Sequence, residues 1–225
     1  MVSASSAHRA VGRPRQGAVD ARDSLLDAAV NLFSEKGVAG TTFAEIAAGG
    51  GVTAAMVHYY FSSRDQLLDA VAAERLQPIV TSIWEPVVES SEIEAVLSGL
   101  VQRILKAAEV NPWLPALWLR EIISEGGQLR ARLLRTVRFD YVQHLIGTVT
   151  EAQRRGELNP ELEPRLVFIS VLGVTLMPLA NLRLLQQVPL LKGIKREDVA
   201  RHARALLASA FARRRPRRRP IRRGA

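Results

Sequence analysis

One stretch of the chain decides the fold: residues 42–68, TFAEIAAGGGVTAAMVHYYFSSRDQLL. Thr42 and Glu45 have the spacing of a capping box, in which the threonine hydroxyl caps a backbone N–H and the glutamate reaches back to the threonine N–H. Ser63 and Gln66 repeat this spacing and open a longer helix. Between the two pairs, three consecutive glycines predict a sharp turn. The stretch therefore predicts short helices separated by a turn.

This spacing favours a helix-turn-helix. Thr53 takes the N-cap position of a helix that ends near Phe61. An apolar stripe of helical period over residues 25–33 predicts a preceding helix, which Gly37 ends. In a helix-turn-helix the second helix of the pair enters the major groove of DNA, and here that is the helix after Thr53.

The same residues resemble the DNA-binding segment of TetR-family transcriptional regulators. The resemblance covers roughly residues 20–76 and is carried by three motifs in order: TFAEIA at 42–47, GVT at 51–53 and YYFSSRDQLL at 59–68. The family usually has tyrosine where this chain has His58, lysine where it has Arg64, and alanine where it has Gly50. The first two positions face phosphates or bases, so the operator sequence of relatives is not carried over.

The resemblance implies an all-α protein with an N-terminal three-helix DNA-binding domain and a larger helical domain for ligand binding and dimerisation. Residues 128–155 are expected to form one long helix that ends at Gly156, and residues 166–185 and 199–211 suit a four-helix dimer seam. The expected organisation is a flexible basic arm at 1–18, the helix-turn-helix domain at 19–62, the ligand-binding and dimerisation domain at 63–212, and a disordered arginine-rich tail at 213–225.

Residues expected to contact DNA lie on the second helix, at the helix starts and in the basic arm. Tyr59 is expected to contact phosphate or a base edge, although both tyrosines could instead fill the small core. Arg64 is expected to bind a phosphate, and the arm could lie in the minor groove or stay solvated. The full set is Thr42, Thr53, Ala54, Ala55, His58, Tyr59, Tyr60, Arg64, Arg13 and Arg15.

The larger domain offers residues for an apolar cavity with a few polar groups, as small-molecule sites usually have. Aromatic and methionine residues at helical spacing are more often core than pocket, so the identity of the effector stays open. The candidates are Trp113, Trp118, Arg120, Glu121, Phe139, Tyr141, His144, Phe168, Thr175 and Met177.

The charge of the chain is unevenly distributed. Its net charge is +9, but residues 213–225 alone hold eight arginines, and residues 19–76 carry four bases and eight acids. The basic character therefore belongs to the tails, and a nonspecific basic DNA-binding protein is the alternative function. Without cysteine, and with four scattered histidines, the chain lacks the nucleophile–base pair or metal cluster of an enzyme, and no cofactor or metal is expected.

A membrane protein is not expected. The uncharged residues 166–182 approach the length of a membrane span, but Pro178 and Asn181 are among the residues that interrupt them. The first sixteen residues have no apolar core, so cytoplasmic residence is expected. The resemblance to the TetR family implies a ligand-responsive repressor that binds double-stranded operator DNA as a homodimer and is released by a small, largely apolar effector. Recognition helices about 34–36 Å apart, or at a related spacing, would require an inverted-repeat operator.

Overall fold

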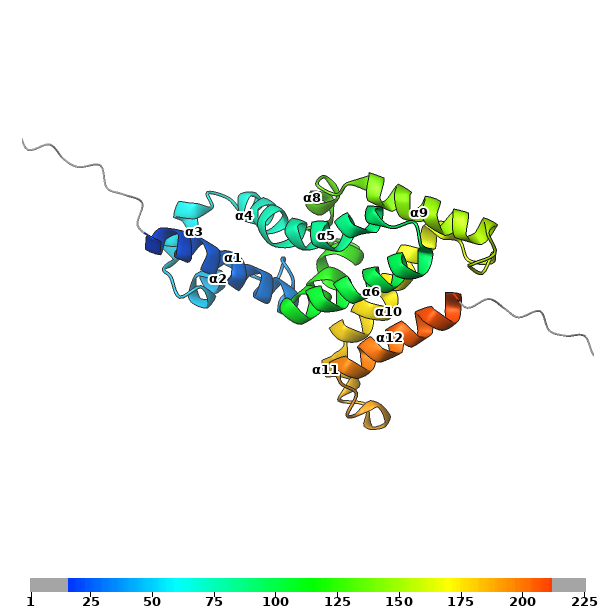
Figure 1. Cartoon of the computed structure of the whole chain (residues 1–225). Coiled ribbons are helices and arrows are strands. Elements are labelled where there is room, and N and C mark those ends of the chain that lie inside the picture. Colours follow the sequence, from blue (N-terminus) through cyan, green and yellow to red (C-terminus); the bar gives the residue numbers. More distant parts are fainter. Residues whose placement is uncertain (1–15, 212–225) are drawn as a thin grey trace, which may run out of the picture.

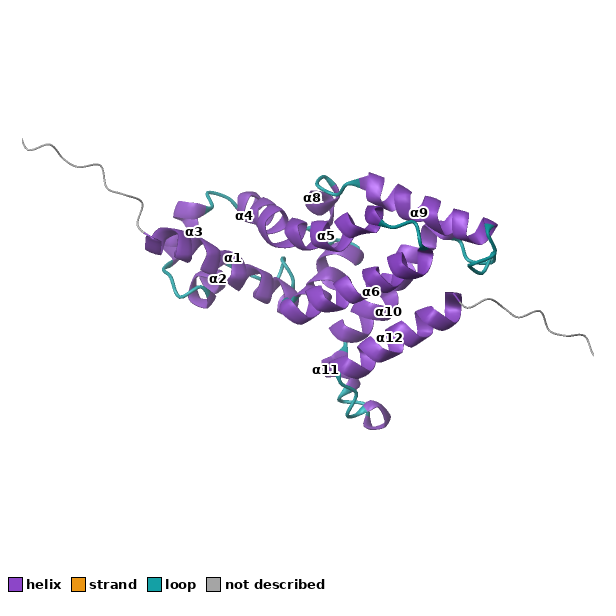
Figure 2. Ribbon diagram, in the orientation of Figure 1, coloured by secondary structure: helices purple, strands orange, loops and turns teal. Residues whose placement is uncertain are grey.

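The computed structural model describes residues 16–211, and every regular element in that range is helical (Figures 1 and 2). The all-α fold class is confirmed. In chain order the elements are α1 (Gln16–Lys36), α2 (Phe43–Gly49), α3 (Ala54–Tyr60), α4 (Arg64–Val71), η1 (Ala72–Leu76), α5 (Gln77–Trp84), η2 (Glu85–Glu89), α6 (Ile93–Val110), α7 (Leu114–Leu117), η3 (Trp118–Ile123), α8 (Arg130–Leu134), α9 (Phe139–Arg154), η4 (Pro164–Leu166), α10 (Val167–Ala180), α11 (Leu182–Leu185), η5 (Pro189–Leu191) and α12 (Arg196–Phe211).

Helices α1 to α3 form the predicted DNA-binding domain, and local signals set their ends. Gly37 takes a φ of 80° after α1, a conformation that glycine adopts without steric cost. The predicted capping box opens α2: Thr42 N–H donates to Glu45 Oε2 at 2.8 Å, and Glu45 N–H donates to the Thr42 hydroxyl at 3.3 Å. Gly51 has a φ of 68° in the turn before α3, so the glycine run bends the chain as expected.

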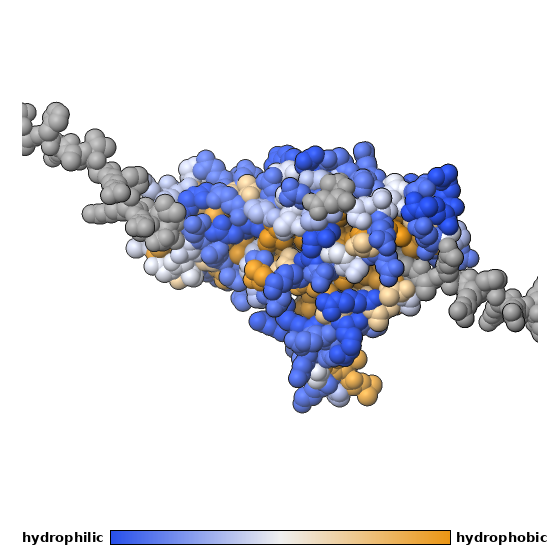
Figure 3. Space-filling view, viewed as in Figure 1, coloured by the Kyte–Doolittle hydropathy of each residue, from blue (hydrophilic) through white to orange (hydrophobic). Residues whose placement is uncertain are grey.

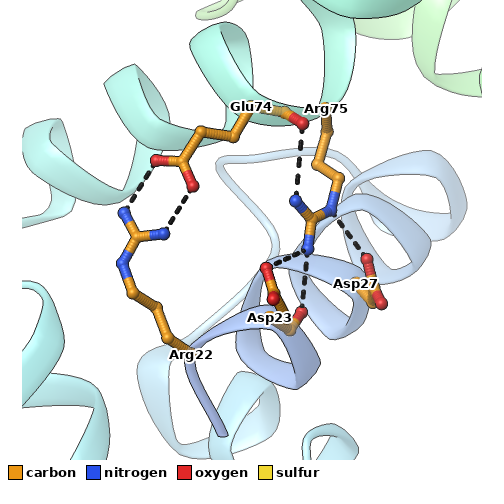
Figure 4. A network of polar contacts seen from close by, with 5 residues as sticks. All are labelled: Arg22, Asp23, Asp27, Glu74 and Arg75. Carbon is orange, nitrogen blue, oxygen red and sulfur yellow. Dashed lines mark hydrogen bonds and ion pairs between the residues drawn. The ribbon is translucent and has the colours of Figure 1, made fainter. Parts of the chain in front are cut away.

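One helical stretch, α4–η1–α5, connects the DNA-binding domain to the larger domain (Figure 1). The hydroxyl of Ser63 accepts from Gln66 N–H at 3.2 Å, as predicted. The Gln66 side chain, however, accepts from Ser62 N–H at 3.0 Å, one residue earlier than a capping box requires. In the middle of the stretch, η1 is a π-helical segment, and its Glu74 and Arg75 point toward α1 (Figure 4).

The larger domain is built around α6 and α10, which pack against each other and against α12. Leu100 and Ile104 of α6 and Val171 of α10 are fully buried in a core that continues into the DNA-binding domain through Phe33. The uncharged stretch of the sequence forms α10, which is 14 residues long. Among the described residues, none of the helices combines the length and apolar character needed to cross a membrane.

Three helix boundaries differ from the prediction. The expected helix at 128–155 is two helices, α8 and α9, because the chain leaves the helical conformation after α8 and is extended at Arg138. Gly156 does follow α9, with a φ of 69°. Helix α1 begins at Gln16, so residues 16–18 of the expected arm are helical. Asn181 interrupts the segment 166–185 and separates α10 from α11.

Candidate DNA-binding and effector sites

Helix α3 presents one face to solvent and anchors the other in the core. Val57 is fully buried, and Phe61 directly after the helix is 1% exposed. Tyr59 is 79% exposed, and its ring packs edge-on against Tyr60 with the centroids 5.0 Å apart. Tyr60 is half-buried and packs against the core, so the two tyrosines divide between the outer and inner faces. The exposed candidates are Thr42, Thr53, Ala54, Ala55, His58 and Tyr59.

The two threonines at the helix starts differ. The Thr42 hydroxyl is engaged with Glu45 in the capping box. Thr53 stands at the N-cap of α3, but its side chain makes no capping hydrogen bond. Its exposed hydroxyl is therefore available to an external partner. Arg13 and Arg15 of the basic arm, like the arginine-rich tail at 213–225, lie outside the described residues.

The predicted phosphate contact requires an Arg64 side chain that projects into solvent. In the structure this side chain points instead to backbone carbonyls. Its guanidinium is half-buried and donates to Thr41 O at 2.9 Å and to Val38 O. Carbonyls in the turn after a helix need partners outside the helix, and Arg64 supplies them. This arginine thus fixes the turn between α1 and α2 against the start of α4.

Ion pairs between α1 and η1 neutralise several of the acidic residues in the DNA-binding region (Figure 4). Arg22 donates to both carboxylate oxygens of Glu74, at 2.5 and 2.7 Å. Arg75 bridges Asp23 and Asp27 at 2.9 and 2.7 Å. The hydrogen bonds from Arg22 lower the pKa of Glu74.

Other acidic residues of this region form ion pairs with Arg132 and Lys36. Arg132 of α8 pairs with Asp65 and, at 2.7 Å, with Asp69. Lys36 pairs with Glu45 at 2.5 Å, and this contact, with the hydrogen bonds from Thr42, lowers the pKa of Glu45 to about 2. Because α3 itself contains no acidic residue, the exposed face of α3 is free of the negative charge that the sequence shows for this region.

Glu121 joins the two domains. It is 5% exposed, and its carboxylate accepts from Val38 N–H at 2.7 Å and from Gln128 N–H at 2.9 Å. Val38 belongs to the turn between α1 and α2, whereas Glu121 belongs to η3 of the larger domain. Glu121 was expected in the effector pocket, but its burial and these two hydrogen bonds make it a structural contact between the domains.

Two of the ligand candidates, Trp118 and Phe168, line a small apolar cavity of about 20 Å³. Trp84 packs on Phe168 with ring centroids 4.4 Å apart, and Leu176 contributes from α10. The indole N–H of Trp118 is buried and has no hydrogen-bond partner among the described residues. A ligand here would need an apolar body and a hydrogen-bond acceptor.

Trp113 and Arg120 line a different cavity, of about 480 Å³, between α1 and the larger domain. Tyr141 lines a third, of about 60 Å³, where the Arg138 guanidinium lies 4.8 Å from the centre of its ring. The predicted ligand residues are therefore distributed over three cavities and do not form one pocket.

Besides Glu121, four ligand candidates lie outside these three cavities: Thr175, Phe139, Met177 and His144. Thr175 is fully buried and donates to Val171 O at 2.7 Å, so its hydroxyl is already used within α10. Phe139 and Met177 are more than half exposed, and His144 is exposed. These three side chains do not line the cavities described above. Sequence alone could not separate them from cavity residues, because helical spacing does not show which face is covered.

Residues 25–71 match the model of the family described as bacterial regulatory proteins, tetR family. The chain is 32% identical over 143 residues to the nicotine-responsive transcriptional repressor HdnoR of Paenarthrobacter nicotinovorans, covering 63% of this chain and 73% of the relative. The chain belongs to the TetR family of transcriptional regulators. This TetR-family regulator is also 22% identical over 147 residues to the transcriptional repressor KstR2 of Rhodococcus jostii, covering 65% of this chain and 72% of the relative.

Solved structures share the fold of this TetR-family regulator. FadR from Bacillus subtilis in complex with stearoyl-CoA superposes with a TM-score of 0.62 and 19% identity, covering 85% of this chain and all of that one (100%). The ketosteroid transcriptional regulator KstR2 of Mycobacterium tuberculosis superposes with a TM-score of 0.63 and 18% identity, covering 84% and 92% of the two chains. The predicted family and its DNA-binding helix-turn-helix are therefore confirmed, and the matched relatives are regulators of transcription.

Proposed function

We propose that this TetR-family regulator represses transcription by binding an inverted-repeat operator as a homodimer, and that a small, largely apolar effector releases it. The observation that carries the proposal is the exposed face of α3, where Tyr59 and Thr53 project from a helix anchored by buried Val57. A helix of this kind reads base edges in the major groove. Two relatives, HdnoR and KstR2, are named as repressors, which favours repression over activation.

An apolar stripe on α10 supports the homodimer. Ile169 and Met177 are 54% and 59% exposed, lie two helical turns apart and have exposed Gly173 between them. Leu206 of the neighbouring α12 is also exposed, and apolar surface gathers around α6 and α10 in the space-filling view (Figure 3). A second copy that packs its α10 and α12 on these helices would cover the stripe and form a four-helix seam.

The apolar cavity at Trp118 supports the effector proposal. HdnoR is described as nicotine-responsive, and the FadR structure contains stearoyl-CoA, so organic molecules act on or bind to proteins of this kind. In this chain the cavity is nearly filled, so a ligand must displace side chains such as Phe168 to enter. The unpartnered Trp118 N–H would then gain an acceptor, which favours the occupied state.

The π-helix η3 provides a route from effector to DNA. Trp118 at its start lines the cavity, and Glu121 three residues later holds Val38 beside the DNA-binding helices. A ligand that displaces Trp118 would shift Glu121, and with it the turn that precedes α2. The ligand acts only through its different affinities for the two states, and a coupling of about 1–3 kcal/mol changes DNA affinity roughly 5–150-fold.

Selection of bound duplexes from a random DNA library tests the proposal. The selection uses the chain shortened to residues 1–212, which lacks the arginine run, so that any sequence preference comes from the remaining residues. An enriched inverted repeat is the expected result. If no sequence is enriched and binding returns only with the tail, the proposal is wrong and the protein is a nonspecific basic DNA binder.

A further inference from the structure

The cavity of about 480 Å³ between α1 and the larger domain has the features of a second ligand site. Helix α1 contributes Glu35, η3 contributes Arg120, the start of α11 contributes Arg183, and the start of α12 contributes Arg196. Three arginines and one glutamate give the lining a net charge of +2. Such a cluster attracts an anion.

The arginines of this cavity are not neutralised within the described part of the chain. The exposed side chains of Arg120 and Arg183 form no ion pair or hydrogen bond with another described residue, whereas Arg22, Arg75 and Arg132 each bind carboxylates. Arg196 donates through one nitrogen, to Ala108 O at 3.0 Å, which leaves its other N–H groups available. Guanidinium groups form their strongest hydrogen bonds with anionic oxygens, so a carboxylate suits this cluster.

The rest of the lining combines the polar residues Asn31 and Ser34 of α1 with apolar side chains of the larger domain. Trp113 and Pro115 on one segment and Leu179 and Leu182 on another contribute their side chains to the same cavity. We propose that this cavity binds a small organic acid, with its carboxylate among Arg120, Arg183 and Arg196 and its apolar body against Trp113 and Leu182. The site is separate from the apolar cavity at Trp118 and goes beyond the effector proposal.

The position of the site gives such a ligand a regulatory role. The aliphatic part of the Arg120 side chain packs against Gly37, where a Cβ atom would lie only 3.1 Å from Arg120 Cδ. Gly37 ends α1, and Arg120 is adjacent to Glu121, which holds the following residue Val38. An acid bound to Arg120 would therefore lie next to the contacts of Arg120 with Gly37 and of Glu121 with Val38, which connect the two domains.

Calorimetric titration of the full chain with 1-naphthoate tests the site, and the neutral 1-naphthamide serves as the matched ligand. We expect naphthoate to bind at least about tenfold more tightly than the amide, since the carboxylate gains charge-assisted hydrogen bonds. The double variant Arg120→Gln, Arg183→Gln should lose about tenfold or more of the naphthoate affinity. Arg204→Gln is the matched control, because Arg204 is an exposed arginine that lines a different groove.

Three outcomes would overturn the proposal: no naphthoate binding at millimolar concentration, equal affinity for acid and amide, or unchanged affinity in the double variant. Loss of naphthoate binding in Trp118→Phe, with the double variant unaffected, would place the acid in the apolar cavity instead. Far-ultraviolet circular dichroism checks that the variants fold. Since the titration contains no DNA, its failure leaves the proposed repressor function standing.

Discussion

Replacement of Glu121 by alanine is expected to destabilise the protein by about 2–4 kcal/mol. The substitution leaves two backbone N–H groups, those of Val38 and Gln128, without their acceptor. A buried donor left unsatisfied costs about 1–3 kcal/mol. Val38 is fully buried and takes the full penalty, whereas Gln128 is half-buried, so water can partly replace the lost oxygen.

Glu121→Gln gives an intermediate expectation. The amide oxygen can accept from one of the two N–H groups, but its NH₂ group faces the other donor. About half of the alanine effect should therefore remain. The comparison separates the loss of hydrogen bonds from the loss of side-chain volume, because glutamine and glutamate are nearly the same size.

Urea unfolding followed by tryptophan fluorescence measures these differences, at one protein concentration because the proposed dimer would contribute to stability. Glu125→Ala is the matched control, since Glu125 is exposed and only four residues away, and it should stay within about 0.5 kcal/mol of the wild type. If Glu121→Ala also stays within that range, the contact between Glu121 and Val38 does not hold the domains together.

Three further predictions concern other parts of the molecule. The pKa of Glu45 is about 2, against an ordinary value of 4.5, so its ionised carboxylate stabilises the fold above pH 4.5 and this contribution is lost as the pH falls towards 2. In urea unfolding, Glu45→Gln should therefore lose less stability than the wild type between pH 5 and pH 2. Ile169→Glu should convert the dimer to monomer in sedimentation analysis, whereas the same substitution at exposed Val110 should not; a dimeric Ile169→Glu would refute the α10 seam. Gly51→Ala should cost about 1–2 kcal/mol in thermal unfolding because of its positive φ, although nothing lies near the added Cβ; an unchanged melting temperature would count against strain in this turn.

The helix-turn-helix could be predicted because its signals are local. The capping box joins Thr42 to Glu45 only three residues away, and the glycine conformations at Gly37 and Gly51 follow from residue type. The break between α8 and α9 could not be predicted because residues 135–138 contain neither glycine nor proline, although the chain is extended at Arg138. Helix boundaries could therefore be predicted more accurately in the DNA-binding domain than in the larger domain.

The roles of Arg64 and Glu121 could not be predicted, since their partners are distant in sequence. Arg64 binds carbonyls 23 and 26 residues earlier, and Glu121 binds an N–H group 83 residues earlier. The cavities raise the same difficulty, because each collects side chains from several helices. Trp113 and Trp118 are five residues apart yet line different cavities, which no periodicity in the sequence distinguishes.

The central claim is that the exposed face of α3 reads a DNA sequence. The most direct test is the ratio of affinities for the selected inverted repeat and for a scrambled duplex of equal length, at one salt concentration. We expect Tyr59→Ala to lower this ratio by about 1–3 kcal/mol, or roughly 5–150-fold. Leu190→Ala, at a site 95% exposed on the segment between α11 and α12, should leave the ratio unchanged. An unchanged ratio in Tyr59→Ala would contradict recognition through this face of α3.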